Sequence, residues 1–423
     1  MKKTHALIGT ALALLLAISA CTRNDNEASP SPSPTPEQTA TTPPTATGAT
    51  GTSFDNWGSY GYTLANTRHV PFTEITAENV QDLGVIWSAD LKALDKDVKN
   101  GNQSYPVVVD GVVFVTTAGN QVFALDAVTG NQIWHWKPTA EQAATFAKAG
   151  IIANRGVAVG EGKVFTLAID NSLIALDQKT GELVKMIKLS DYIDGVTLEN
   201  GYYETTAPQY YKGNVYIGSS GGDNGVRGFV AAFRASDLTP AWDSPFWTVP
   251  PKGQDWLANS RFQGGGAVWN PVAIDEETDL VYFATGNPAP DFYGANRPGD
   301  NPHTDSVVAV NAMTGKLVWS RQEVSHDLWD YDAAASPMII NATVKGEKKK
   351  LVVQGGKSGL WFAWDAATGD VVWDGIPFAK IDHPKPTAEG VIGYPGVLGG
   401  ENYAPESYDP ATNYVLIPGI EQP

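Results

Sequence analysis

Seven residues with polar or aromatic side chains are candidates for chemistry if the fold brings them together. Arg155 and Lys357 offer positive charge to an anionic ligand. The carboxylate of Asp223 and the amide oxygen of Asn287 are hard oxygen ligands of the kind that calcium requires. A carboxylate can also remove a proton from a substrate, and a Trp face can bind a flat ring. The set consists of Arg155, Asp223, Trp269, Asn287, Asp330, Asp332 and Lys357.

Each of these residues also has a plainer interpretation when it is considered alone. Asp223 lies in GGDNG, where an Asp commonly forms a turn. Asn287 precedes a Pro and fits a turn as well. Asp330 and its neighbour Asp327 fit loop carboxylates, and Arg155 fits a surface or blade-edge ion pair. His326, in HDLWDYD, is expected to order its loop by hydrogen bonding rather than to transfer protons. The chemistry therefore depends on the elements that position these side chains.

A repeat organises most of the chain. Ala-x-Asp-x-x-Thr-Gly-x-x-x-Trp recurs with variations, and Lys185 replaces the Trp in one copy. The ends of successive copies, beginning with Trp87, are roughly 47 to 77 residues apart, which is typical of propeller blades. The Trp residues are expected to pack between neighbouring blades, and the repeat ends are Trp134, Trp242, Trp319 and Trp373.

Hairpin signals lie between the repeats. Asp-Gly and Lys-Gly-Asn turns separate β-branched runs in residues 106–117, 157–167, 209–220 and 272–286. Four strands per unit predict an all-β fold, a β-propeller in which five or six blades can be counted.

The composition excludes several classes of protein. The 423 residues include 29 Lys and Arg and 46 Asp and Glu, so the formal charge is −17 and nucleic acid is not an expected partner. The single Cys excludes an internal disulfide, a Cys-rich zinc site and a CxxCH haem attachment.

The N-terminus resembles a bacterial lipoprotein signal. Lys2 and Lys3 precede an apolar run over 6–18, and Cys21, the expected lipidation site, follows directly after Ala20. A chance Cys after an ordinary signal is the alternative. The sequence predicts a signal peptide over 1–20, a Pro/Ser/Thr-rich tether over 21–53 and a propeller over 54–423. The folded part is expected outside the cytoplasm, attached to a membrane surface (periplasm or cell surface) only by its lipid.

The repeat and the segments between its copies resemble the PQQ-dependent alcohol/glucose dehydrogenase family of eight-bladed quinoproteins. The matching segments follow the family's order from about residue 55 onward: ANRGVAV, TTAP, SSGGDNGVRG, GGGAVWNP, ATGNPAP, HDLWDYD, GGKSGLWFAWD and GGENYAPESYDP. The resemblance implies that a group of residues binds the cofactor pyrroloquinoline quinone (PQQ), namely Gln103, Arg155, Thr205, Ser220, Gly221, Gly222, Trp269, Lys357 and Asn402.

The resemblance also implies a metal site and a base. Ca²⁺ would be bound by Asp223, Asn287, Asp330 and Asp332, and Asp330 would remove the alcohol proton. Asp332 resembles the marker of lanthanide-dependent relatives, but sugar-oxidising relatives carry a similar Asp-x-Asp, so both metals stay open.

The implied function is oxidation of an alcohol, polyol or sugar, with hydride transfer to a metal-polarised quinone. Electrons would pass to a separate acceptor, a cytochrome c or a quinone. A non-catalytic propeller scaffold lipoprotein and an inactive fragment are the alternatives.

Four features depart from the family pattern. Asp223 replaces a longer Glu, Gln103 replaces a Glu, and 149–150 lack the family's adjacent Cys pair. The countable blades number fewer than eight, so the sequence is interpreted as C-terminally truncated.

Overall fold

The computed structural model describes residues 56–149, 153–251, 256 and 263–423. These residues belong to one of the two units into which the chain divides, residues 54–423. Cys21, the predicted signal peptide, the predicted tether and Gly150 lie outside the described residues.

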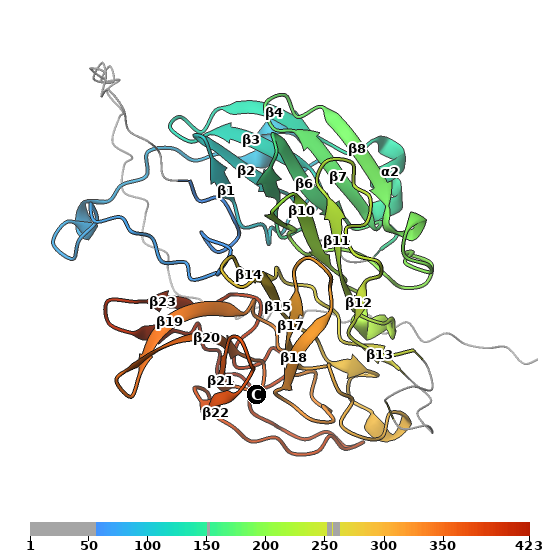
Figure 1. The fold of residues 1–423 in the computed structure, drawn as a ribbon. Helices are drawn as coiled ribbons and strands as arrows, with labels where there is room; N and C mark the ends of the chain where they lie inside the picture. Colours follow the sequence, from blue (N-terminus) through green and yellow to red (C-terminus); the bar gives the residue numbers. More distant parts are fainter. Residues whose placement is uncertain (1–55, 150–152, 252–255, 257–262) are drawn as a thin grey trace, which may run out of the picture. The chain divides into compact units, whose positions relative to one another are not determined.

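Five four-stranded antiparallel sheets follow one another along the chain (Figure 1). We call them blades 1 to 5. Blade 1 contains β1 (Val107–Val109), β2 (Val112–Thr116), β3 (Val122–Asp126) and β4 (Gln132–Trp136). Blade 2 contains β5 (Ala158–Gly160), β6 (Lys163–Ala168), β7 (Ser172–Asp177) and β8 (Leu183–Lys188). Blade 3 contains β9 (Gln209–Tyr211), β10 (Asn214–Gly218), β11 (Phe229–Arg234) and β12 (Phe246–Trp247).

The last two blades are built in the same way. Blade 4 contains β14 (Ala273–Asp275), β15 (Leu280–Ala284), β17 (Ser306–Asn311) and β18 (Leu317–Gln322). Blade 5 contains β19 (Met338–Val344), β20 (Glu347–Gly355), β21 (Leu360–Asp365) and β22 (Val371–Pro377). Two further pairs join β13 (Gly264–Gly265) to β16 (Pro288–Ala289) and β23 (Ser407–Asp409) to β24 (Tyr414–Leu416). The short helices are α1 (Leu91–Leu94) and α2 (Ala140–Phe146).

The architecture confirms the predicted all-β propeller fold. Each predicted hairpin forms the first two strands of a blade, and the Asp110-Gly111 turn has positive φ at both residues, as its sequence requires. Among the described residues, five complete blades and the β23–β24 hairpin account for the five or six countable units.

The repeat Trp residues join each blade to the next. The indole Nε1 of Trp134 donates to the carbonyl oxygen of Gln178 at 3.0 Å, in the turn after β7 of blade 2. Gly181 of that turn has φ +72°, and a Cβ there would lie 2.5 Å from the Trp134 ring. Trp242 and Trp319 donate in the same way to Ala312 and Ala366. The predicted structural role of these three Trp residues is confirmed.

Lys185 occupies the Trp position of blade 2 and, like the Trp residues, donates a hydrogen bond to a backbone carbonyl of the next blade. Its Nζ donates to the carbonyl oxygen of Asp237, in the turn after β11 of blade 3, at 2.5 Å. Apolar side chains fill the space between these two sheets, with Phe165 of β6 and Phe229 of β11 both fully buried in one cluster. Blade packing therefore continues where the Trp is absent.

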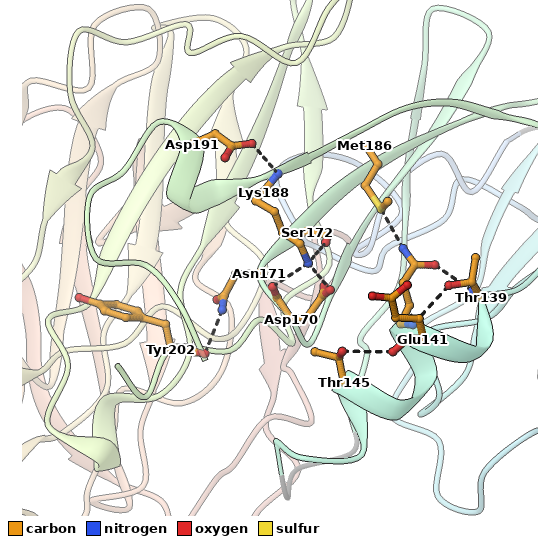
Figure 2. A network of polar contacts seen from close by, with 11 residues as sticks. Thr139, Glu141, Thr145, Asp170, Asn171, Ser172, Met186, Lys188, Asp191 and Tyr202 are labelled. Atoms are coloured by element: carbon orange, nitrogen blue, oxygen red, sulfur yellow. Dashed lines mark hydrogen bonds and ion pairs between the residues drawn. The ribbon is translucent and has the colours of Figure 1, made fainter. Parts of the chain in front are cut away.

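A polar network at the β6–β7 turn fixes the segment that leads from blade 2 to blade 3 (Figure 2). Lys188 Nζ donates to Ser172 Oγ at 2.9 Å and forms an ion pair with Asp170. Asn171 Nδ2 donates to the carbonyl oxygen of Tyr202 at 3.0 Å. The turn thus holds the chain just before residues 203–205.

A search of the described helices finds none that is both long enough and apolar enough to cross a bilayer.

Candidate functional site

One cavity of about 250 Å³ brings the predicted site residues together. Its lining includes every residue predicted to bind cofactor or metal: Gln103, Arg155, Thr205, Ser220, Gly221, Gly222, Asp223, Trp269, Asn287, Asp330, Asp332, Lys357 and Asn402. Ala153, Tyr203 and Ala267 complete it, and sequence reasoning did not single them out. Of the predicted site residues, Cys21 alone lies outside the described part of the chain.

Blade topology explains why residues so far apart in sequence converge. The start of a blade's first strand and the end of its second strand lie at the same edge, because the two strands are antiparallel. Arg155, Thr205, Trp269 and Asp330 precede first strands, whereas 220–223, 287 and 357 follow second strands. In blade 3 the Tyr203–Ser220 bridge shows this pairing directly.

Arg155 is a buried cation that faces the cavity. One of its terminal nitrogens donates to Thr205 Oγ1 at 2.5 Å, and Thr205 Oγ1 lies 2.8 Å from Ser220 Oγ. The guanidinium carbon lies 4.6 Å from the centre of the Trp269 ring. No carboxylate pairs with Arg155 within the described ranges, and its Nε has no hydrogen-bond partner there. Burial lowers the pKa of Arg155 to about 10, so the side chain stays positive at neutral pH.

A triad of charges lies elsewhere in the same cavity lining. Lys357 Nζ lies 3.1 Å from Asp330 Oδ2 and 2.5 Å from Asp332 Oδ2. Although burial opposes its charge, the two carboxylates raise the pKa of Lys357 above its ordinary range. Burial and the charge of Asp332 raise the pKa of Asp330 to about 8, and Lys357 partly opposes this shift.

The candidate metal ligands line this cavity as well. Asn287 Nδ2 donates to Asp291 Oδ1 at 2.8 Å, which leaves the amide oxygen of Asn287 for a ligand. Burial, followed by the charges of Asp332 and Asp291, raises the pKa of Asp223 to about 6. In the described part of the chain, no three His, Cys, Asp or Glu side chains converge closely enough to bind a metal ion. A cation here would therefore need amide or cofactor oxygens in addition to carboxylates.

The backbone at Asp330 adopts a rare conformation. Its φ is +66°, in the left-handed region that non-glycine residues seldom adopt. The carboxylate of Asp327 accepts hydrogen bonds from the N–H groups of Trp329 and Tyr331, both at 2.9 Å, and so brackets Asp330. Asp327 on its own is typical of a loop carboxylate, and nothing in the sequence signals this bracketing role. His326 contacts the carbonyl oxygen of Gly299 at 2.7 Å, as its predicted loop-ordering role requires.

Asn402 lines the cavity, but its side-chain amide forms hydrogen bonds within its own loop. Its Nδ2 donates to the carbonyl oxygen of Leu398 at 2.9 Å, and its Oδ1 accepts from the N–H of Tyr403 at 2.8 Å. The adjacent Tyr403 ring lies 5.8 Å from the Arg155 guanidinium, so this loop also contributes an aromatic face.

Comparisons with known proteins identify the family of the propeller. Residues 57–379 match the PQQ family described as the glucose/ethanol/alcohol dehydrogenase β-propeller domain. The dehydrogenase subunit of an alcohol dehydrogenase (quinone) from Gluconobacter oxydans (strain 621H) is 34% identical to this chain. The match covers 89% of this chain and 55% of that protein. The quinohemoprotein alcohol dehydrogenase ADH IIB of Pseudomonas putida is 31% identical to this chain. The match covers 87% of this chain and 56% of that protein.

Solved structures are similar over the same region. A quinohemoprotein alcohol dehydrogenase, ADHIIG from Pseudomonas putida HK5, matches with a TM-score of 0.77 at 30% identity, covering 87% of this chain and 57% of that one. A europium-containing methanol dehydrogenase matches with a TM-score of 0.73 at 26% identity, covering 86% of this chain and 68% of that one. This chain spans about half the length of the curated relatives it matches. Because the family model matches most of the propeller, the chain belongs to the PQQ-dependent alcohol dehydrogenase family.

Proposed function

We propose that this chain is the catalytic propeller region of a PQQ-dependent dehydrogenase that oxidises an alcohol. The observation that carries the proposal is the buried, carboxylate-free guanidinium of Arg155, stacked on Trp269 in the same cavity as the Asp330–Lys357 pair. A buried cation without an anionic partner is costly, so this site is suited to a ligand with negative charge.

The residues present fit a flat, anionic quinone. Arg155, Thr205 and Ser220 would bind its carboxylates, and the Trp269 face would support its ring. Lys357 would lie at the quinone oxygens. When bound, PQQ supplies the hydride acceptor for the reaction.

Oxygen donors around the cavity fit a hard cation. Asp223, Asn287, Asp330 and Asp332 would contribute oxygens to Ca²⁺ or a lanthanide together with cofactor oxygens, because no three carboxylates in the described residues converge into a complete site. The shorter side chain of Asp223, compared with Glu, would place its carboxylate farther from the ion or reduce its contacts to one oxygen.

Asp330 is proposed as the base. Because its pKa is about 8 in the cofactor-free protein, the base form prevails above that pH, and this carboxylate would accept the hydroxyl proton of the alcohol while the carbon-bound hydrogen leaves as hydride to the quinone. Lys357, 3.1 Å away, orients that carboxylate, and Asp327 holds the backbone on both sides of it.

Several further features are proposed from the sequence. Primary alcohols are the first substrates to test, followed by polyols and sugars, and the electrons would pass to a separate cytochrome c or quinone. Cys21 is proposed to carry lipid and to hold the propeller at a membrane surface outside the cytoplasm; Cys21→Ser should release the protein from the membrane fraction.

Reconstitution tests the proposal. The purified chain is mixed with PQQ and either Ca²⁺ or La³⁺, and PQQ binding is followed by Trp fluorescence before dye reduction is measured with an alcohol and glucose panel. We expect binding and turnover with alcohols, and Asp330→Asn should bind PQQ but not turn over. Absence of PQQ binding would contradict the proposal, and binding without turnover would identify an inactive fragment.

A further inference from the structure

Arg297 is a large side chain buried completely within the described structure, with 0% exposure, and no role in the site has been given to it so far. It does not line the cavity. We propose that Arg297 is a positioning residue that fixes the loop carrying Asn287 to the segment carrying Asp330. The inference rests on the proposed function, because it concerns the metal ligand and the base of that site.

The guanidinium of Arg297 contacts one segment through backbone oxygens. Its Nε and one terminal nitrogen both donate to the carbonyl oxygen of Pro290 at 3.1 Å, and that terminal nitrogen also donates to the carbonyl oxygen of Asp291 at 3.1 Å. The side chain of Asp291 in turn accepts from the amide of Asn287 at 2.8 Å. Fixing the backbone of residues 290–291 therefore fixes the direction of the Asn287 amide.

The same guanidinium contacts the second segment. The nitrogen that donates to Asp291 also donates to the carbonyl oxygen of Asp327. The side chain of Asp327 holds the N–H groups of Trp329 and Tyr331, on the two sides of Asp330. One planar group thus joins the anchor of the metal-ligand loop to the anchor of the base.

A third contact holds Arg297 itself in place. Its other terminal nitrogen donates to Asn301 Oδ1 at 2.8 Å, and Asn301 Nδ2 donates back to the carbonyl oxygen of Arg297 at 2.9 Å. The two segments also meet directly, because the N–H of Asn287 donates to Asp332 Oδ1 at 2.8 Å. The geometry of the candidate ligands therefore depends on a closed chain of bonds with Arg297 at its centre.

The chemistry of the contacts requires an Arg. Three carbonyl oxygens and one amide oxygen surround a flat fork of donors, whereas the three donors of a Lys ammonium radiate from one point. No carboxylate lies within ion-pair distance of Arg297 in the described residues, although Asp327, Asp305 and Asp291 contribute negative charge nearby. Lys at this position would keep the charge but lose most of the bridge.

The test compares Arg297→Lys with Arg234→Lys. Arg234 is the control, because it is an exposed Arg that donates to a side-chain oxygen of Thr239 and the carbonyl oxygen of Pro240 and does not line the cavity. For Arg297→Lys we expect PQQ affinity within about 3-fold of the unmodified chain, La³⁺ affinity by calorimetry weaker by about 10- to 100-fold, and kcat lower by a similar factor with little change in KM. The control should match the unmodified chain in all four measurements.

Hydrogen exchange gives a readout that requires neither cofactor nor turnover. In Arg297→Lys, peptides covering 286–292 and 327–332 should exchange faster, while peptides from β20 and β21 should keep their protection. If Arg297→Lys fails to fold, Asn301→Ala, which removes one contact of the fork, should show the same pattern at smaller amplitude. If the unmodified chain binds no PQQ, the proposed function fails, and the exchange pattern still decides the role of Arg297. Unchanged exchange in these two segments, or unchanged La³⁺ affinity in a chain that binds La³⁺, would overturn the inference.

Discussion

The ammonium of Lys357 lies 3.1 Å from the carboxylate of Asp330 in a cavity where both side chains are largely buried. The same ammonium also contacts Asp332 at 2.5 Å, so one cation serves two carboxylates. Lys357 is therefore the cation that both acidic groups share.

Replacement of Lys357 by Met should destabilise the cofactor-free protein by about 3 kcal/mol, because it leaves the buried Asp330–Asp332 pair without its cation. Lys212→Met is the control, since Lys212 is half exposed and pairs with Asp279 at 2.8 Å. The control should cost far less, because water screens an exposed ion pair. Urea unfolding measures both, and equal losses would show that the Lys357 pair is not a buried one in solution.

Arg155→Leu should separate stability from binding. The guanidinium is buried and has no carboxylate partner among the described residues, so its removal should leave the cofactor-free protein equally stable or more stable. PQQ affinity should fall by about 10- to 100-fold, the value of a lost charge-assisted hydrogen bond. Fluorescence titration and thermal unfolding together make the distinction. A destabilised variant with normal PQQ affinity would assign Arg155 a structural role.

The site residues are predicted by the family resemblance of the segments between the repeats, and their regular places in the repeat explain why they converge. Arg155, Trp269 and Asp330 precede first strands, and the hairpin signals that mark those strands are strong local ones. Once the repeat is recognised, convergence of these residues follows from antiparallel geometry.

The supporting residues could not be predicted in this way. Arg297 and Asp327 act through backbone carbonyl and N–H groups, which carry no sequence identity, so no pattern of side chains marks them. Their roles depend on which loops lie against each other, and only the structure supplies that.

Gly181 should be far less tolerant of Ala than Gly162, although both have positive φ in the same blade. At Gly162 nothing lies within 4 Å of an added Cβ, so the left-handed backbone alone should cost about 1 kcal/mol. At Gly181 the Cβ would meet the Trp134 ring at 2.5 Å, and overpacking should raise the total to about 3 kcal/mol. Thermal unfolding of the two variants measures the difference. Equal losses would mean that the Trp–Gly contact does not join blades 1 and 2.

Three buried carboxyl groups outside the cavity lining should make the free energy of unfolding depend on pH. The carboxyl oxygens of Glu323, Glu401 and Glu406 are buried beside Gly355 and Gly356. Burial raises the pKa of Glu406 to about 8, although the charge of Arg68 opposes the shift. The pKa of Glu401 is also raised, by burial and by Glu406.

A carboxyl group with a raised folded-state pKa stabilises the protein below its ordinary pKa and loses that contribution as pH rises. For Glu406 the window runs from its ordinary value of 4.5 to about 8, because within it the folded state keeps a proton that the unfolded state has released. The free energy of unfolding should therefore fall by about 1.4 kcal/mol per pH unit for this group. Glu406→Gln should flatten the profile and be more stable than the unmodified chain at pH 7.5, whereas Glu182→Gln, on the surface, should leave the profile unchanged. Urea unfolding at pH 5, 6, 7 and 8 tests this, and parallel profiles for all three proteins would show that Glu406 is not a buried acid.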